Sequence, residues 1–196
     1  DSHLTGASTL EFVVTRSDGA SLVSQDAVSR MAAFEQAALR HPEVTSVGSV
    51  LPVLRQLQRA ESGDDALVLP PDERATAYAF DLLEAAPEQA LLRKVIAPDF
   101  DAARLNVRIH AVGTSIAAPL AESILDEGRA LLGEDYRVEV TGAFYQVAQD
   151  SNGLVTSQLK SFGSALVLVF IAIAVLLRSL RLTAISFVPN VMPIAW

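Results

Sequence analysis

The chain has 196 residues, of which 51% are hydrophobic and 19% are charged, a length that allows one or two domains. Residues 1–150 carry 12 basic and all 23 acidic side chains, a net charge of −11, whereas residues 151–196 carry only three charges, all basic. This acidic balance argues against a nucleic-acid partner, which requires a basic surface. The chain contains no cysteine, which excludes disulfide bonds and thiolate metal sites.

The first 50 residues predict a strand, a helix and a second strand. Apolar residues alternate with more polar ones through residues 9–15, as in a strand with one apolar face. These apolar residues are Leu10, Phe12 and Val14. Ser24 is placed to cap a helix that ends at His41-Pro42. The apolar side of this helix consists of Val28, Met31, Phe34, Ala38 and Leu39. A second, short strand is predicted over residues 44–50.

Residues 51–101 form a stretch that is too long for a bare loop. A Pro-Pro-Asp-Glu sequence at residues 70–73 predicts a helix that runs to about Ala86. Pro87-Glu88 predicts another helix that runs to about Val95. We therefore expect a helical insertion over about residues 51–101.

A second strand–helix–strand unit follows this insertion. Strict alternation of apolar and polar residues over residues 104–111 is the clearest strand pattern in the chain. Its apolar residues are Leu105, Val107, Ile109 and Ala111. Residues 113–115 turn into a helix that Gly133 closes. The predicted apolar side of this helix consists of Ile116, Leu120, Ile124 and Leu131. A fourth strand is predicted over residues 136–141.

Two strand–helix–strand units in one sheet give a ferredoxin-like, split β-α-β fold with both helices on one face. The sequence therefore predicts an α+β domain over residues 1–150. The stretch after Gly142 contains a single glycine break, Gly153, so we expect a helix to continue from this domain almost without interruption. Movement of the helix that follows would then be transmitted to the domain.

Residues 162–177 contain no charge and read FGSALVLVFIAIAVLL. These residues form about 24 Å of helix at about 1.5 Å per residue, against a bilayer core of about 30 Å. Extension to Leu159 brings in Lys160, whose aliphatic stem can reach toward the headgroups. A buried core helix is disfavoured because residues 171–177 are apolar on every face. We predict a connecting and transmembrane helix over residues 151–178.

Arg178 and Arg181 follow this apolar stretch directly, and no Lys or Arg lies between Arg137 and Lys160. The positive-inside rule then places the two arginines in the cytoplasm and residues 1 to about 158 on the other side of the membrane. Residues 179–196 are predicted to form a cytoplasmic turn and the start of a further transmembrane helix. We expect both ends of the chain to be cuts through a longer protein.

Several stretches carry a family resemblance. They are residues 4–6, 41–50 (HPEVTSVGSV), 140–142, 157–158 and 176–194 (LLRSLRLTAISFVPNVMPI). The Arg-Ser-Leu-Arg turn followed by Pro-Asn-x-x-Pro is the most specific of these. The chain resembles a periplasmic region of exporters of the resistance-nodulation-division (RND) superfamily. It is most similar to the mycobacterial-membrane-protein-large (MMPL) and hopanoid-exporter type, which is related to Patched-like proteins.

The resemblance implies the second periplasmic, porter-type domain of a bacterial inner-membrane transporter, followed by its eighth helix and the start of its ninth. It also implies export of hydrophobic or lipid-like molecules, driven by the proton motive force. The implied partners are the membrane, the cargo and the remaining domains of the transporter. In this family the proton-relay carboxylates lie on the fourth and tenth helices, outside this chain, so no relay residue and no cofactor is assigned. A membrane-tethered binding or sensory domain is the alternative.

Enzyme and metal sites are disfavoured by the residue patterns. Residues 113–117 (GTSIA) resemble a nucleophile elbow, but the fifth position is Ala and no His follows Ser115, so a helix cap is favoured for Ser115. The three histidines, His3, His41 and His110, lie in unrelated segments without metal-ligand spacing. Asp99 and Asp101 are interpreted as solvated loop acids rather than as a cation site or an acid/base pair. No catalytic, cofactor or metal residue is predicted.

Two pairs of side chains have open interpretations. Phe144 and Tyr145 either line a substrate path, anchor the chain at the membrane interface or pack within the domain. Arg104 and Arg108, on the polar face of the third strand, either face solvent or dock a neighbouring domain of the transporter. Docking is slightly favoured, because exporter domains of this type pack together to enclose a route for substrate.

Overall fold

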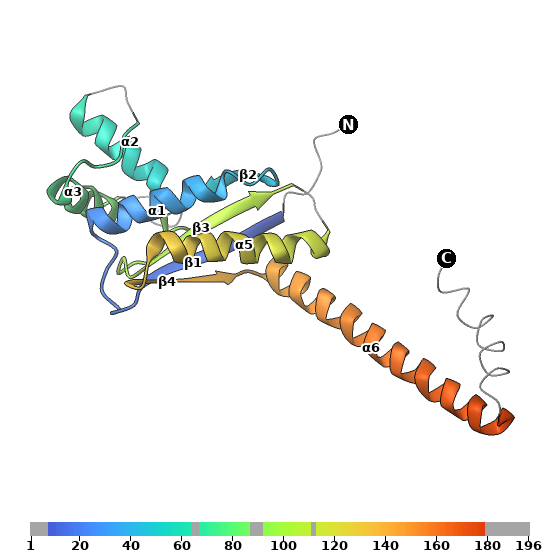
Figure 1. The fold of residues 1–196 in the computed structure, drawn as a ribbon. Coiled ribbons are helices and arrows are strands. Elements are labelled where there is room, and N and C mark those ends of the chain that lie inside the picture. The colour runs from blue at the N-terminus through green and yellow to red at the C-terminus, as the bar shows by residue number, and fades with distance from the viewer. Residues whose placement is uncertain (1–7, 64–66, 87–91, 111–112, 179–196) are drawn as a thin grey trace, which may run out of the picture. The chain divides into compact units, whose positions relative to one another are not determined.

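The computed structural model describes residues 8–63, 67–86, 92–110 and 113–178 (Figure 1). The chain divides into two compact units, Asp1–Gln149 and Asp150–Trp196.

The first unit is built on a four-stranded antiparallel sheet. Its strands are β1 (Ser8–Arg16), β2 (Val44–Gly48), β3 (Ala102–Ile109) and β4 (Tyr136–Thr141), in the order β2-β3-β1-β4. β3 lies between β1 and β2, and β1 lies between β3 and β4. The two strands of each strand–helix–strand unit are therefore separated in the sheet by a strand of the other unit. All four predicted strands are confirmed, and β2 is two residues shorter than predicted.

The alternation predicted for β1 is confirmed by its burial. Leu10, Phe12 and Val14 are completely buried, whereas the intervening residues are half-buried. Phe12 lies opposite Leu105 of β3 and opposite Val140 of β4, so one sheet face forms the floor of the core. The hydrophobic effect therefore selects which face of each strand points inward, because a shift of one residue would expose the whole apolar set.

Helices α1 (Gln25–Ala38) and α5 (Thr114–Leu132) pack side by side against this core (Figure 1). The Ser24 side chain accepts a hydrogen bond from the Ala27 amide at 3.1 Å, which confirms it as the N-cap of α1. The predicted apolar side of α1 is buried except for Leu39, which forms the C-cap and is 40% exposed. α1 thus ends just before Leu39, and this leaves Leu39 beyond the packed face.

Two predictions for α5 are wrong. Gly113, not Ser115, is the N-cap, and Ser115 lies exposed in the first turn. Ile116 and Leu131 are exposed, whereas Leu120 and Ile124 are buried as predicted. The buried face also uses Ala117, Ala121 and Leu132. The helix therefore presents alanine together with leucine and isoleucine side chains to the core, and Ile116 and Leu131 lie outside this buried face.

The insertion contains helices α2 (Leu51–Ser62) and α3 (Glu73–Glu84). α3 confirms the helix predicted from residues 70–73, with the Asp72 side chain capping the Ala75 amide at 2.8 Å. α2 was not predicted separately. Residues 87–91, where a further helix was predicted to begin, lie outside the described residues.

The helix predicted to run to about Val95 ends at Leu92 in the described residues. Residues 93–95 form a turn, and Ile96 makes a β-bridge to Ala103 at the start of β3. The Arg104 amide donates to the Val95 carbonyl at 2.7 Å, and the Ala97 amide donates to the Ala102 carbonyl at 2.8 Å. Strand pairing satisfies these backbone groups, while the amides of Val95 and Ile96 donate to the Leu92 carbonyl, each at 2.9 Å.

Helix α6 (Ala143–Leu177) is 35 residues long and confirms the prediction of a helix that continues past Gly153. Its Ser157–Leu176 stretch has a mean hydropathy of 2.3, and none of it is buried. Among the described residues this is the one helix that is long and apolar enough to cross a membrane.

Candidate functional site

The apolar stretch of α6 exposes the large hydrophobic side chains that a soluble helix would bury. Leu168 is 70% exposed and Val175 is 71% exposed, and the stretch contains no Asp, Glu or His. A contiguous exposed apolar surface of this kind marks a membrane or protein interaction site. Arg178 follows the last helical residue and is exposed, and Arg181 lies outside the described residues.

The described residues among those considered for catalysis or metal binding do not converge. His41 Nε2 lies 3.1 Å from Glu127 Oε1, His110 is exposed, and His3 lies outside the described residues. Within the described ranges no group of three or more His, Asp or Glu side chains is arranged to hold a metal ion. Asp99 and Asp101 are exposed on either side of Phe100, whose ring packs edge-on against Phe80 at 5.2 Å.

Phe144 and Tyr145, for which three interpretations were open, are half-buried and pack against the hydrophobic core. This contact supports the packing interpretation. Packing of these two rings against the core also gives the start of α6 an apolar contact within the first unit.

A cluster around Asp26 joins α1 to the end of α5 and to β4. Arg30 donates to both Asp26 carboxylate oxygens at 2.8 and 2.9 Å and also to the Leu132 carbonyl at 2.8 Å. The Tyr136 hydroxyl donates to Asp26 at 2.9 Å. The hydrogen bond from Arg30 is the main cause that lowers the pKa of Asp26, while burial raises the pKa of Tyr136. These hydrogen bonds stabilise the charged form of the Asp26 carboxylate. The cluster therefore has a structural role rather than a role in proton transfer.

A buried carboxylate connects α1 to the insertion. The Glu35 side chain is 6% exposed and accepts hydrogen bonds from the Ser49 hydroxyl at 2.6 Å and from Arg55 of α2 at 3.2 Å. The Ser49 hydroxyl also accepts from the Leu51 amide at the start of α2, at 3.2 Å. Burial of a charge is tolerated because it is paired and hydrogen-bonded. Sequence analysis missed Glu35, because nothing in its spacing distinguishes it from an exposed acid.

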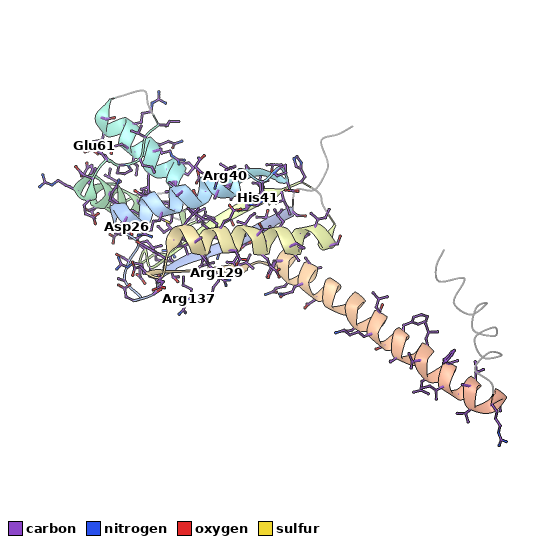
Figure 2. The ribbon with its side chains drawn as sticks, in the orientation of Figure 1. Asp26, Arg40, His41, Glu61, Arg129 and Arg137 are labelled. Atoms are coloured by element: carbon purple, nitrogen blue, oxygen red, sulfur yellow. The ribbon has the colours of Figure 1, made fainter. Side chains whose placement is uncertain are left out.

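A groove of about 500 Å³ lies between the end of α1 and the second half of α5. Arg40 and His41, both labelled in Figure 2, form one wall, and Glu127 and Leu131 form part of the other. The Arg40 guanidinium lies 3.9 Å from Glu127. The groove therefore carries one carboxylate that faces two basic side chains.

Two further cavities share Arg93, Ile96, Ala97 and Pro98 in their walls. The first, of about 250 Å³, is also lined by residues of α3 and by Leu92, Asp99 and Phe100. The second, of about 270 Å³, contains three basic residues in its wall. They are Arg93, Lys94 and Arg104. Sequence analysis singled out Arg104 but missed Arg93 and Lys94. These two basic residues are adjacent in a strongly acidic domain, and that pairing could have drawn attention to them.

Comparison with protein families decides which class of protein carries these features. The sequence model of the MMPL family matches residues 16–189. The chain belongs to the MMPL family. This confirms the resemblance to RND-type exporters that the sequence motifs predicted. A comparison with curated proteins found no match.

Membership of the MMPL family places the chain among membrane transporters, and it implies the inner membrane. The exposed apolar stretch of α6 is compatible with that location.

Proposed function

We propose that this chain is part of an RND-type exporter in a bacterial inner membrane that moves hydrophobic or lipid-like molecules with the proton motive force. The observation that carries the proposal is the exposed apolar stretch Ser157–Leu176, which follows an acidic α+β unit in a chain of the MMPL family. Apolar surface on this scale is stable in hydrocarbon and costly in water.

We infer that the first unit is a ferredoxin-like, porter-type domain over residues 1–150, with a helical insertion over about residues 51–101. The strand order β2-β3-β1-β4 and the antiparallel pairing support this assignment. The polar face of β3 would dock a neighbouring domain of the transporter. Arg104 and Arg108 both project from exposed positions there, and Arg104 pairs with Glu11 of β1 at 3.6 Å.

Residues 151–178 are proposed to connect to and cross the membrane, with residues 179–196 as a cytoplasmic turn and the start of the next transmembrane helix. Arg178 and Arg181 would face the cytoplasm, and the acidic unit would be periplasmic, as the positive-inside rule requires. The proposed span carries no Asp, Glu or His, so the protons that drive transport would pass through other helices of the transporter.

The alternative, a membrane-tethered sensory or binding domain, is not favoured by the family match. A transporter requires further transmembrane helices after this chain, whereas a sensor continues into a cytoplasmic signalling domain. Deletion of the full-length gene should cause cargo to accumulate on the inner side of the membrane if the proposal is right.

The orientation can be tested directly, because the chain contains no cysteine that would interfere with labelling. Glu61→Cys places a thiol at an exposed position of α2 (Figure 2), and Ser179→Cys places one between the two arginines. A membrane-impermeant maleimide should label Glu61→Cys in intact cells and Ser179→Cys only after lysis. Equal labelling of both variants in intact cells would contradict the proposed topology.

A further inference from the structure

A tight hairpin joins the segment that contains Ile96 to β3. The Ala97 amide donates to the Ala102 carbonyl at 2.8 Å at the base of the hairpin, and the Phe100 amide donates to the Ala97 carbonyl at 3.0 Å within its turn. Residues 98–101 form the hairpin tip. Three of these four residues are exposed, whereas Phe100 is partly buried and packs against the core. Phe100 is therefore the side chain that attaches the hairpin tip to the domain.

The backbone of the hairpin tip is strained at this same residue. Phe100 has a φ of 56°, and it and Arg178 are the residues other than glycine with a positive φ in the described part of the chain. Positive φ brings the Cβ of an L residue close to the following carbonyl oxygen, so glycine is usual there. A bulky residue in this conformation costs free energy and persists only where its surroundings hold it in place.

Two contacts from segments distant in the chain hold Phe100. Its ring packs edge-on against Phe80 of α3, with ring centroids 5.2 Å apart, and its carbonyl accepts a hydrogen bond from the Leu22 amide at 2.7 Å. Phe80 and Leu22 are 1% and 0% exposed. Release of the hairpin tip would remove the ring contact and would leave the Leu22 amide without this acceptor, and both losses favour the attached state.

Incomplete packing opposes attachment together with the strain. A cavity of about 250 Å³ has Phe100 in its wall, beside Leu83, Leu92 and several polar residues. A side chain that borders a cavity lacks part of the dispersion contacts that a fully packed ring would make. The residues on either side, Asp99 and Asp101, are exposed and so remain hydrated whether or not the tip is attached. The contacts of Phe100 with Phe80 and Leu22 therefore work against two unfavourable contributions.

We propose that the hairpin tip opens and closes on the folded domain, with Phe100 as the residue that holds it closed. In the closed state the Phe100 ring lies against Phe80 and the Leu22 amide is bonded. In the open state the ring leaves the wall of the cavity, the backbone strain is relieved and the cavity is wider. A neighbouring domain or ligand that binds only the open state would shift the equilibrium toward it. This inference does not rest on the proposed export function.

Amide hydrogen exchange of the isotope-labelled 196-residue chain in detergent micelles, followed by NMR at low urea concentrations, tests this proposal. The Leu22 amide reports on the hairpin tip, because it loses its acceptor when the tip opens. The amides of β1 are the internal reference, since β1 pairs with a strand on each side. The variants are Phe100→Ala and Phe100→Gly. Phe34→Leu is the matched control, because it truncates a different core phenylalanine, at the contact between α1 and α5.

In the unsubstituted chain the protection factor of the Leu22 amide should be at least about tenfold lower than those of the β1 amides. It should also depend little on urea, because opening of the tip exposes little surface. Phe100→Ala should lower the protection of Leu22 by about tenfold more and leave β1 unchanged. Phe100→Gly should lower it about fivefold less than Phe100→Ala, because glycine removes the strain of the closed state. Phe34→Leu should lower the protection of β1 and Leu22 together.

Equal protection and equal urea dependence for Leu22 and β1 would show that the hairpin tip opens only when the whole domain unfolds, and would overturn the proposal. The proposal also fails if Phe100→Ala leaves Leu22 unchanged, or if it speeds exchange in β1 as much as at Leu22. Equal effects of Phe100→Ala and Phe100→Gly would overturn the contribution of strain. The measurement requires no transport, so a full-length protein that does not export would refute the proposed function and leave this inference standing.

Discussion

The contact between Gly128 of α5 and Phe34 of α1 offers a quantitative test of the packing that supports the domain. A Cβ added at Gly128 would lie 2.7 and 2.8 Å from two ring carbons of Phe34. Phe34 is completely buried, and its ring packs edge-on against Phe12 at 5.7 Å, so it cannot move away freely. The absence of a side chain at Gly128 therefore allows the two helices to approach each other.

Gly128→Ala should destabilise the domain. Overpacking of this kind costs about 1–3 kcal/mol, and the rigid surroundings of Phe34 favour the upper end. The better helix propensity of Ala offsets about 1 kcal/mol of this cost. The expected net loss is about 2 kcal/mol, which corresponds to a decrease in Tm of roughly 4–8 °C for a domain of about 150 residues.

Thermal unfolding of the chain in detergent micelles, followed by circular dichroism at 222 nm, measures this loss. Gly153→Ala is the matched control, because a Cβ there would meet nothing within 4 Å and only the gain in helix propensity remains. Combining Gly128→Ala with Phe34→Leu should recover part of the loss. If Gly128→Ala is as stable as the unsubstituted chain, the two helices are further apart than described and the reasoning fails.

Three further tests concern the buried carboxylate, an exposed ion pair and the membrane segment. Glu35→Ala should cost about 2 kcal/mol in urea unfolding, because it leaves the Arg55 cation, which is 22% exposed, without its buried partner; an unchanged midpoint would contradict the role given to Glu35. Arg16 forms an exposed ion pair with Asp18 at 2.7 Å, and its hydrogen bonds hold the pKa of the Asp18 carboxyl at about 2, below the ordinary 3.8. The stabilising contribution of this pair is therefore complete above about pH 4 and is lost as the pH falls toward 2. The Tm difference between the unsubstituted chain and Asp18→Asn should therefore close over that range, and a constant difference would refute this. Leu168→Arg should reduce retention in alkali-washed membranes, since a central arginine costs about 3 kcal/mol, whereas Leu159→Arg near the end of the stretch should be tolerated.

Local pattern determined a large part of this structure. In β1 and β3 a single apolar face was sufficient to predict the strand, because the inward face of a pleated strand must be apolar at every second residue. Ser24 and Asp72 cap their helices through contacts within three residues, which a short sequence window contains. The apolar stretch of α6 was evident for the same reason: its composition alone makes it costly to expose to water.

Tertiary structure decided the features that depend on partners distant in the chain. The buried face of α5 turns toward Phe34 because Gly128 permits close approach, and the apolar side chain of Ile116 remains exposed although its spacing predicted burial. Arg93 and Arg104 line one cavity because a β-bridge joins segments that a sequence pattern treats as separate. Local periodicity reports how a residue relates to its own helix or strand, but burial and convergence of charges depend on which elements pack together.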